Sequence, residues 1–143
     1  MNIRGSEQLT RVFGYWPSFH DAEVVRLELV RAASFGEGPE LLADVHTFEI
    51  TNEVGLNGRL VLRHHVLVSF RFRGVDQLHI KDWNNQNALM GLRLEDIRSR
   101  QLELLRFEVS FDSAWGMAAK FLCRSIEIDA VRPWELSSRE RDL

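Results

Sequence analysis

The sequence has a single cysteine, no long apolar run and no excess of positive charge, and each shortage excludes a class of protein. Cys123 alone forms neither an internal disulfide nor a cysteine-based zinc site. No stretch approaches the roughly 20 apolar residues of a membrane-spanning helix. Residues 1–8 lack the apolar segment and cleavage site of a secretory signal peptide. We therefore expect a cytoplasmic protein that has no membrane partner.

Positive charge is too scarce for general nucleic-acid binding. Lysine and arginine number 18 against 21 acidic residues, and the net charge is -3. No basic field therefore attracts a phosphate backbone. Phe70 and Phe72 alternate with Arg71 and Arg73, which places the aromatic and basic groups on opposite faces of a strand. Strands that bind RNA present both on one face, so we expect no nucleic-acid partner.

Signals of catalysis are also missing. The sequence has no Gly-x-Ser-x-Gly nucleophile elbow, and its glycines fit neither dinucleotide nor triphosphate loops. Cys123 continues the apolar alternation of Ala119 and Phe121, so its thiol is expected to be inert packing. We expect no cofactor and no enzymatic activity.

Apolar periodicity predicts a mainly β single-domain protein with one short N-terminal helix. The composition fits one domain over residues 1–143, with a core of about 6–133 and a polar tail at 134–143. The helix is expected to begin with Ser6 as its N-cap and to stop at Gly14. Seven or eight strands joined by short turns favour an antiparallel β-sandwich or curled sheet. Strands are expected at 23–30, 41–51, 60–73, 75–83, 89–97, 105–111 and 117–130.

Three of these strands carry more detailed predictions. The apolar face of the first strand is expected to hold Val25, Leu27 and Leu29. The long third strand should bend or bulge near His64 and His65, with His64 on its apolar face. In the last strand, the apolar phase slips after Cys123, which predicts a bulge inside one continuous strand.

The segment WPSFHDAEV, residues 16–24, combines a turn breaker, two aromatics and a His-Asp-Glu trio. Pro17 stops the helix, and the backbone N–H groups that follow need acceptors. We expect the Asp21 carboxylate to supply them. We also expect Trp16, Phe19 and His20 to be buried, which makes the segment a structural element of the fold rather than a catalytic centre.

An alternative interpretation places a metal ion at His20, Glu23 and His46. Neutral imidazole and carboxylate suit zinc or iron, and the protein would then be a metal-dependent small-molecule binder or hydrolase. Nothing in the spacing requires such a site. This hypothesis demands that the three side chains converge on one point.

The WPSFHDAEV segment resembles the signature of a family of small bacterial proteins, the predicted immunity proteins of polymorphic toxin systems (immunity protein type fifty). The same resemblance extends over five further segments between residues 13 and 133. These segments are 45–54, 66–72, 84–87, 111–116 and 121–124.

The resemblance implies a mainly β, non-enzymatic protein that binds and blocks a cognate toxin. It supplies a partner class but no binding face. The residues that we expect to contact the partner are Trp83, Asn85, Gln86 and Asn87 in one loop, with Glu49 and Glu53 near another. For the loop, hydrogen-bonded turn structure is the competing interpretation. Self-association as a homodimer through open sheet edges is a further alternative.

Overall fold

The structure is a computed structural model that describes residues 3–31 and 38–134. The predicted polar tail lies outside the described residues except for Trp134. The helices are α1 (Ser6–Phe13) and the short 3₁₀ helix η2 (Arg98–Arg100). The strands are β1 (Glu23–Val30), β2 (Glu40–Val54), β3 (Leu60–Arg73), β4 (Asp76–Lys81), β5 (Ala88–Asp96), β6 (Phe107–Trp115), β7 (Ala118–Cys123) and β8 (Ser125–Pro133).

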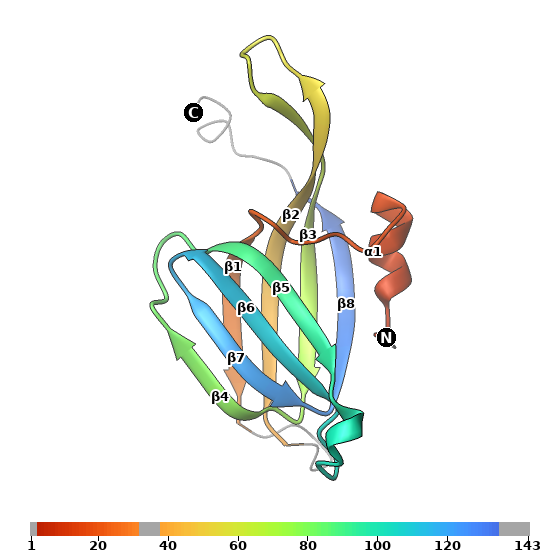
Figure 1. The fold of residues 1–143 in the computed structure, drawn as a ribbon, viewed down its shortest axis with the longest axis vertical. Coiled ribbons are helices and arrows are strands. Elements are labelled where there is room, and N and C mark those ends of the chain that lie inside the picture. Colours follow the sequence, from red (N-terminus) through yellow and green to blue (C-terminus); the bar gives the residue numbers. More distant parts are fainter. Residues whose placement is uncertain (1–2, 32–37, 135–143) are drawn as a thin grey trace.

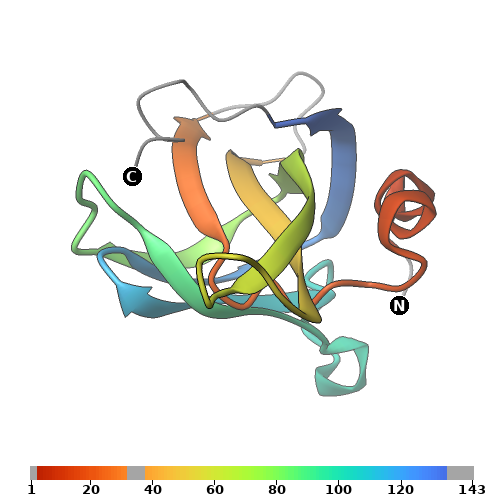
Figure 2. The same cartoon turned by 90° about the horizontal axis from the view of Figure 1, so that it is seen from above.

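The eight strands form one antiparallel sheet in the order β4-β7-β6-β5-β1-β2-β3-β8 (Figure 1). Its two four-stranded halves are joined at β1 and β5 by a single residue pair, Glu23 with Ala88. Because this link is so narrow, the sheet curls and its halves face each other (Figure 2). The prediction of a mainly β protein with a curled antiparallel sheet is confirmed.

The core lies between the two halves and is rich in phenylalanine. Phe72 of β3 packs against Phe121 of β7, with ring centroids 5.0 Å apart, and against Phe111 of β6 at 6.0 Å. All three side chains are buried. Since each fully buried phenylalanine contributes about 1.5–3 kcal/mol, this aromatic contact is a main source of cohesion between the halves.

The two halves also meet where the chain crosses between them. The Arg124 N–H donates to the Arg73 carbonyl at 2.8 Å, which places the β7–β8 link beside the β3–β4 link. Gly74 has a φ of +64°, and a Cβ there would lie 2.3 Å from Cδ of Arg124. A side chain at position 74 would therefore push the links apart.

This crossing corrects the prediction of one bulged strand over residues 117–130. β7 pairs with β4 and β6, whereas β8 pairs with β3 in the other half. The slip in apolar phase after Cys123 marks the passage between two strands. The sequence pattern shows only that the apolar residues change phase. A bulge and a passage between two strands both produce that change, so the pattern does not distinguish them.

Helix α1 lies beside β8 and buries Leu9 and Phe13. Its start differs from the prediction, because the N-cap is Gly5 in a left-handed conformation, with no side-chain cap. A Cβ at Gly5 would lie 2.3 Å from the Ile128 carbonyl oxygen, so close packing on β8 decides the residue. The predicted stop at Gly14 is confirmed, since its N–H donates to the Thr10 carbonyl at 2.7 Å.

The apolar face predicted for β1 is wrong in part. Val24 is buried and Leu27 packs on the core, but Val25 and Leu29 are exposed. The pairing of β1 with β2 shifts between Val24 and Arg26, so Val25 is an extra residue that changes which side chains face inward.

The bend predicted in β3 is confirmed, but the prediction of a core histidine is wrong. The pairing of β2 with β3 shifts between Thr47 and Glu49, and His64 has a φ of 56°. This left-handed residue turns its side chain outward, where it is exposed and 3.4 Å from the Glu49 carboxylate. The strand therefore has two parts that meet at His64.

Candidate protein-binding site

The hairpin of β2 and β3 extends well beyond the sheet. β1 pairs with β2 only as far as His46, and β8 pairs with β3 only from Val66. Residues 48–64, which we call the arm, therefore form a two-stranded ribbon. Within the described ranges, neither edge of this ribbon has a further strand. Figure 1 shows the arm projecting from one end of the molecule.

Large apolar side chains are exposed along the arm. An isolated two-stranded hairpin is marginally stable in water, and open edges together with exposed apolar side chains are typical of surfaces that contact another molecule. The fully exposed Leu56 occupies the tip. The exposed apolar residues of the arm are Ile50, Val54, Leu56, Leu60 and Leu62.

Polar contacts keep the ribbon in register. The Thr51 hydroxyl donates to the Val61 carbonyl at 2.6 Å. Arg63 pairs with Glu53, and both side chains are more than half exposed. The predicted contact residues Glu49 and Glu53 thus lie on the arm, where each already faces a basic or imidazole group. An ion pair as exposed as Arg63–Glu53 contributes little to stability, so the Glu53 carboxylate remains accessible to a partner, whereas the Glu49 side chain is 26% exposed.

A cluster of aromatic rings forms the base of the arm. Nε2 of His46 lies 3.0 Å from Nδ1 of His65, and Trp134 stacks on His46 with centroids 4.7 Å apart. Because one ring must donate to the other, at least one of the two imidazoles is neutral. Burial lowers the pKa of His65, which favours the neutral form there.

The β4–β5 loop, residues 82–87, lies at the same end of the molecule as the arm (Figure 1). Asn87 is 3% exposed, and its Oδ1 accepts the N–H groups of Asn84 at 2.9 Å and Met117 at 3.0 Å. Its amide therefore organises the loop and is not available to a partner. Trp83, Asn85 and Gln86 are exposed.

Two exposed residues at this end were missed by the sequence analysis. Trp115 is 62% exposed where β6 ends, and Met90 is 61% exposed on β5. The signal for Trp115 was the following Gly116. This glycine marks a turn at the end of the strand, where less of the fold is available to cover an aromatic ring. For the arm the signal was Leu56, an apolar residue among the glycines and asparagine of a turn. We call the arm, the β4–β5 loop, Met90 and Trp115 together the apolar end.

The WPSFHDAEV segment borders the apolar end and differs from the prediction. Phe19 is buried and packs on Trp16 at 5.8 Å and on Phe70 at 5.7 Å. His20 and Asp21 are exposed, with side chains 55% accessible, so the prediction that His20 is buried is wrong.

The prediction that the Asp21 carboxylate holds the turn is also wrong. Its contact in the described part of the chain is with His20, at 3.6 Å. The turn is held by its backbone instead, because the Asp21 N–H donates to the Leu89 carbonyl at 2.9 Å. Strand β5 supplies the acceptor that the sequence analysis assigned to a carboxylate. The His20 ring is anchored by the Met90 carbonyl, 3.0 Å from Nδ1.

The structure does not bring the three predicted metal ligands together. Glu23 pairs with His46 across β1 and β2, but His20 bonds Met90 and His46 bonds His65. Over residues 3–31 and 38–134, no group of three or more His, Cys, Asp or Glu is placed to hold a metal ion. The hypothesis of a metal-dependent binder or hydrolase therefore has no support in this arrangement.

The thiol of Cys123 is a packing group of the core. Cys123 is buried, and burial raises its pKa to about 12. A thiol that holds its proton this firmly is a poor nucleophile near neutral pH. No helix in the described ranges has both the length and the apolar character needed to cross a membrane.

Fold and surface together define a mainly β protein whose exposed apolar end is typical of proteins that bind other proteins. The sequence model of the Imm50 family, immunity protein 50, matches residues 5–134. The chain therefore belongs to the immunity protein 50 family, which confirms the resemblance and supports an immunity-type role. Searches of curated proteins and of solved structures find no match to this chain.

Proposed function

We propose that this protein neutralises a cognate toxin by binding it directly through the apolar end. The toxin would be a protein of a polymorphic toxin system encoded beside it, and the two would meet in the bacterial cytoplasm. The protein acts by occupying a surface of the toxin and performs no chemical step of its own.

The observation that carries this proposal is the arm. Its apolar side chains are exposed on a ribbon that both neighbouring strands leave uncovered. Exposing them to water is unfavourable, and a partner that covers them recovers about 25 cal/mol for each Å² of apolar surface removed from water. Open backbone edges add the option of strand pairing with the partner.

The rim of the same end supplies polar and aromatic groups. Trp83 is 48% exposed and Trp115 is 62% exposed, and tryptophan is enriched among residues that dominate binding energy. Asn85, Gln86, Glu49 and Glu53 are proposed contacts around these rings. Asn87 is excluded from the contact set because its amide is already bonded inside the loop.

The experiment measures binding of the purified neighbouring toxin by calorimetry and growth rescue on co-expression. The test variant is Leu56→Ser with Leu60→Ser, in the arm. The matched control is Val25→Ser with Leu29→Ser, two exposed apolar residues on β1 outside the apolar end. We expect the arm variant to bind at least about 30-fold more weakly, since hot-spot residues contribute about 2 kcal/mol or more, and the control to bind normally.

The outcomes separate the two parts of the proposal. Absence of binding between the wild-type protein and the intact toxin contradicts neutralisation by direct contact. Wild-type binding that the arm variant retains in full contradicts the apolar end as the binding face. Light scattering of the free protein tests the remaining alternative, in which a second copy of the chain covers the arm.

A further inference from the structure

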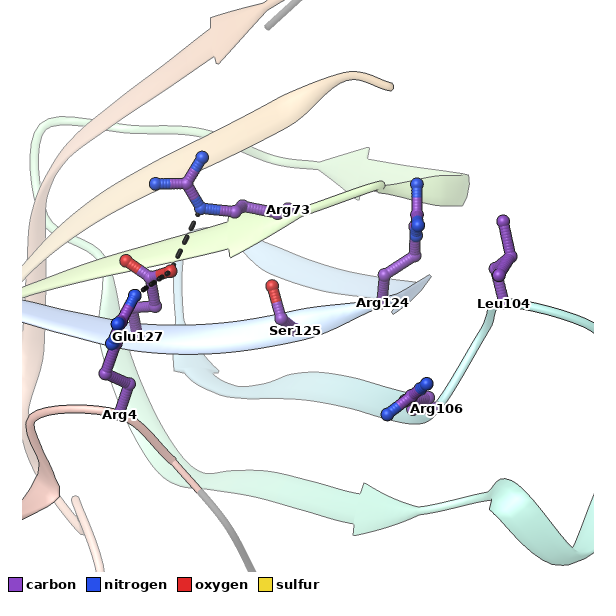
Figure 3. A pocket seen from close by; sticks show the side chains of 7 residues that line it. All are labelled: Arg4, Arg73, Leu104, Arg106, Arg124, Ser125 and Glu127. Atoms are coloured by element: carbon purple, nitrogen blue, oxygen red, sulfur yellow. Dashed lines mark hydrogen bonds and ion pairs between the residues drawn. The ribbon is translucent and has the colours of Figure 1, made fainter. Parts of the chain in front are cut away.

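A second concave site lies at the end of the molecule opposite the arm. It is a pocket of about 420 Å³ between the end of β3, the start of β6 and the β7–β8 link. Figure 3 shows four arginine side chains around Ser125. The lining residues are Arg4, Arg73, Leu104, Arg106, Arg124, Ser125 and Glu127.

Backbone hydrogen bonds fix three of these arginines on neighbouring segments. The Arg124 N–H donates to the Arg73 carbonyl at 2.8 Å, and the Arg106 N–H donates to the Cys123 carbonyl at 2.9 Å. Adjacent strand segments lie about 4.8 Å apart. Arg73, Arg124 and Arg106 are therefore held side by side by the main chain, without depending on flexible side-chain contacts.

Two acidic side chains, Glu127 and Glu40, already bond arginines of the pocket. Glu127 accepts Nε of Arg73 at 3.0 Å and lies 4.0 Å from Arg4. Glu40 accepts the other side of the Arg73 guanidinium at 3.0 Å. Over the described ranges, the guanidinium groups of Arg106 and Arg124 form no ion pair. Among the described residues, the pocket is therefore lined by four cationic side chains and one carboxylate, Glu127.

The chemistry of the lining selects a ligand that only accepts hydrogen bonds. The guanidinium groups and the Ser125 hydroxyl can all donate, and guanidinium forks match phosphate and carboxylate oxygens. The donors come from several segments around the pocket, and a phosphate has more acceptor oxygens and more negative charge than a carboxylate to satisfy several of them at once. We propose that this pocket binds a small phosphate-bearing molecule.

The size and lining of the pocket also limit which chemical groups the phosphate can carry. Among the described residues, its lining contains no aromatic ring on which a base would stack, and Leu104 is the one apolar side chain. Its volume lies near the lower end of the roughly 300–1,000 Å³ typical of small-molecule sites. These features favour inorganic phosphate, pyrophosphate or a sugar phosphate over nucleic acid or an acidic protein segment.

Ligand binding here is independent of toxin binding, because the end of β3 and the start of β6, which line the pocket, lie at the end of the fold opposite the arm (Figure 1). A ligand here would tie together segments from both halves of the curled sheet. A ligand that binds the folded state alone raises the free energy of unfolding, and this gain grows with the logarithm of the ligand concentration once it exceeds the Kd. The occupied protein should therefore unfold at higher temperature while its toxin affinity is unchanged.

The test titrates the full chain with inorganic phosphate, pyrophosphate and a sugar phosphate, and measures heat and melting temperature. Citrate serves as the carboxylate comparison, and an acidic peptide as the protein comparison. Arg106→Ala is the main variant because its side chain is exposed and unpaired in the described ranges. Arg124→Ala is the second variant. The control, Arg132→Ala, removes an exposed arginine of β8 outside the pocket.

We expect saturable binding of at least one phosphate compound, weakened about tenfold or more by Arg106→Ala and by Arg124→Ala, and unchanged by Arg132→Ala. Pyrophosphate alone indicates a free anion as the ligand, whereas preference for the sugar phosphate indicates an ester. Equal weakening by the control, tighter binding of citrate or the acidic peptide, or no saturation by any phosphate compound would overturn the proposal.

Discussion

The two parts of β3 contrast sharply although their sequences look alike. Before Gly74, the alternate residues Val66, Val68, Phe70 and Phe72 are all buried, and the residues between them are only partly buried. Beyond the bend at His64, Leu60 and Leu62 continue the same alternation but are exposed. The difference lies in their neighbours, because β8 covers one edge of β3 only from Val66 onward. An apolar alternation therefore predicts a strand but not its burial.

We call the sheet without the arm the body. Residues that stabilise the fold lie in the body, and residues available for binding lie in the arm. Side chains in the body face the opposite half of the sheet and hold the fold together. Those of the arm face water, so they add little to the free energy of unfolding and are available to a partner. Each of the following predictions compares a residue held by the fold with a more exposed one.

The largest effect is expected from truncating the two parts of β3. Phe70→Ala removes a buried ring that packs on Phe19 and Phe72, and should lower the free energy of unfolding by about 3–5 kcal/mol. Leu62→Ala, in the arm, should change it by no more than about 0.5 kcal/mol. Urea unfolding measures both. If both variants lost similar free energy of unfolding, the arm would be packed in solution, and the distinction between body and arm would be wrong.

A second comparison lies within the β4–β5 loop. Asn87→Ala leaves the buried N–H of Met117 without its acceptor and should lower the free energy of unfolding by about 1–3 kcal/mol. Asn85→Ala alters an exposed side chain and should leave stability unchanged while weakening toxin binding. Thermal unfolding and calorimetry with the toxin separate the two effects. Loss of stability in Asn85→Ala would place that residue in the body.

The histidine pair at the base of the arm should make stability depend on mild acid. The folded-state pKa of His65 lies below its unfolded value of about 6.5. As the pH falls below 6.5, the unfolded chain binds a proton first and stability is lost. The loss is at most about 1.4 kcal/mol per pH unit.

The measurement is urea unfolding at pH 7 and pH 5. His65→Gln should show a smaller loss than the wild type, and the exposed control His79→Gln should lose as much as the wild type. Hydrogen exchange should report the opening first in the arm, because His65 stands where the arm joins the body. An equal loss in His65→Gln would assign the acid sensitivity to other groups.

The smallest effect is expected at Asp21. Because its carboxylate is exposed and the turn is held by backbone bonds, Asp21→Ala should change the free energy of unfolding by no more than about 0.5 kcal/mol. A loss of about 1–3 kcal/mol, the cost of leaving a buried donor without its acceptor, would mean that the Asp21 carboxylate holds the turn, as the sequence predicted. The neighbouring Phe19→Ala should cost several times more, since that ring is buried.

Much of the fold was predictable because its signals are local. Period-two alternation, turn residues and the Gly14 stop depend on a few neighbouring residues, and they located the helix and most strands. The bend near His64 was predictable for the same reason, since one flat strand of that length would not fit a domain of this size. Family membership followed from motifs in the chain itself.

The sequence by itself determined that this is a mainly β immunity protein 50 family member, with Phe70 and Phe72 facing inward and no long apolar helix. Only the tertiary structure decided that His20 and Asp21 are exposed, that Asn87 is buried, and that the last two strands lie in opposite halves. It also decided that the arm is uncovered and that four arginines line one pocket. The physical reason is that these properties depend on which distant segments become neighbours. Burial and charge compensation are set by those neighbours, whereas alternation and turns are set by the residues next in the chain.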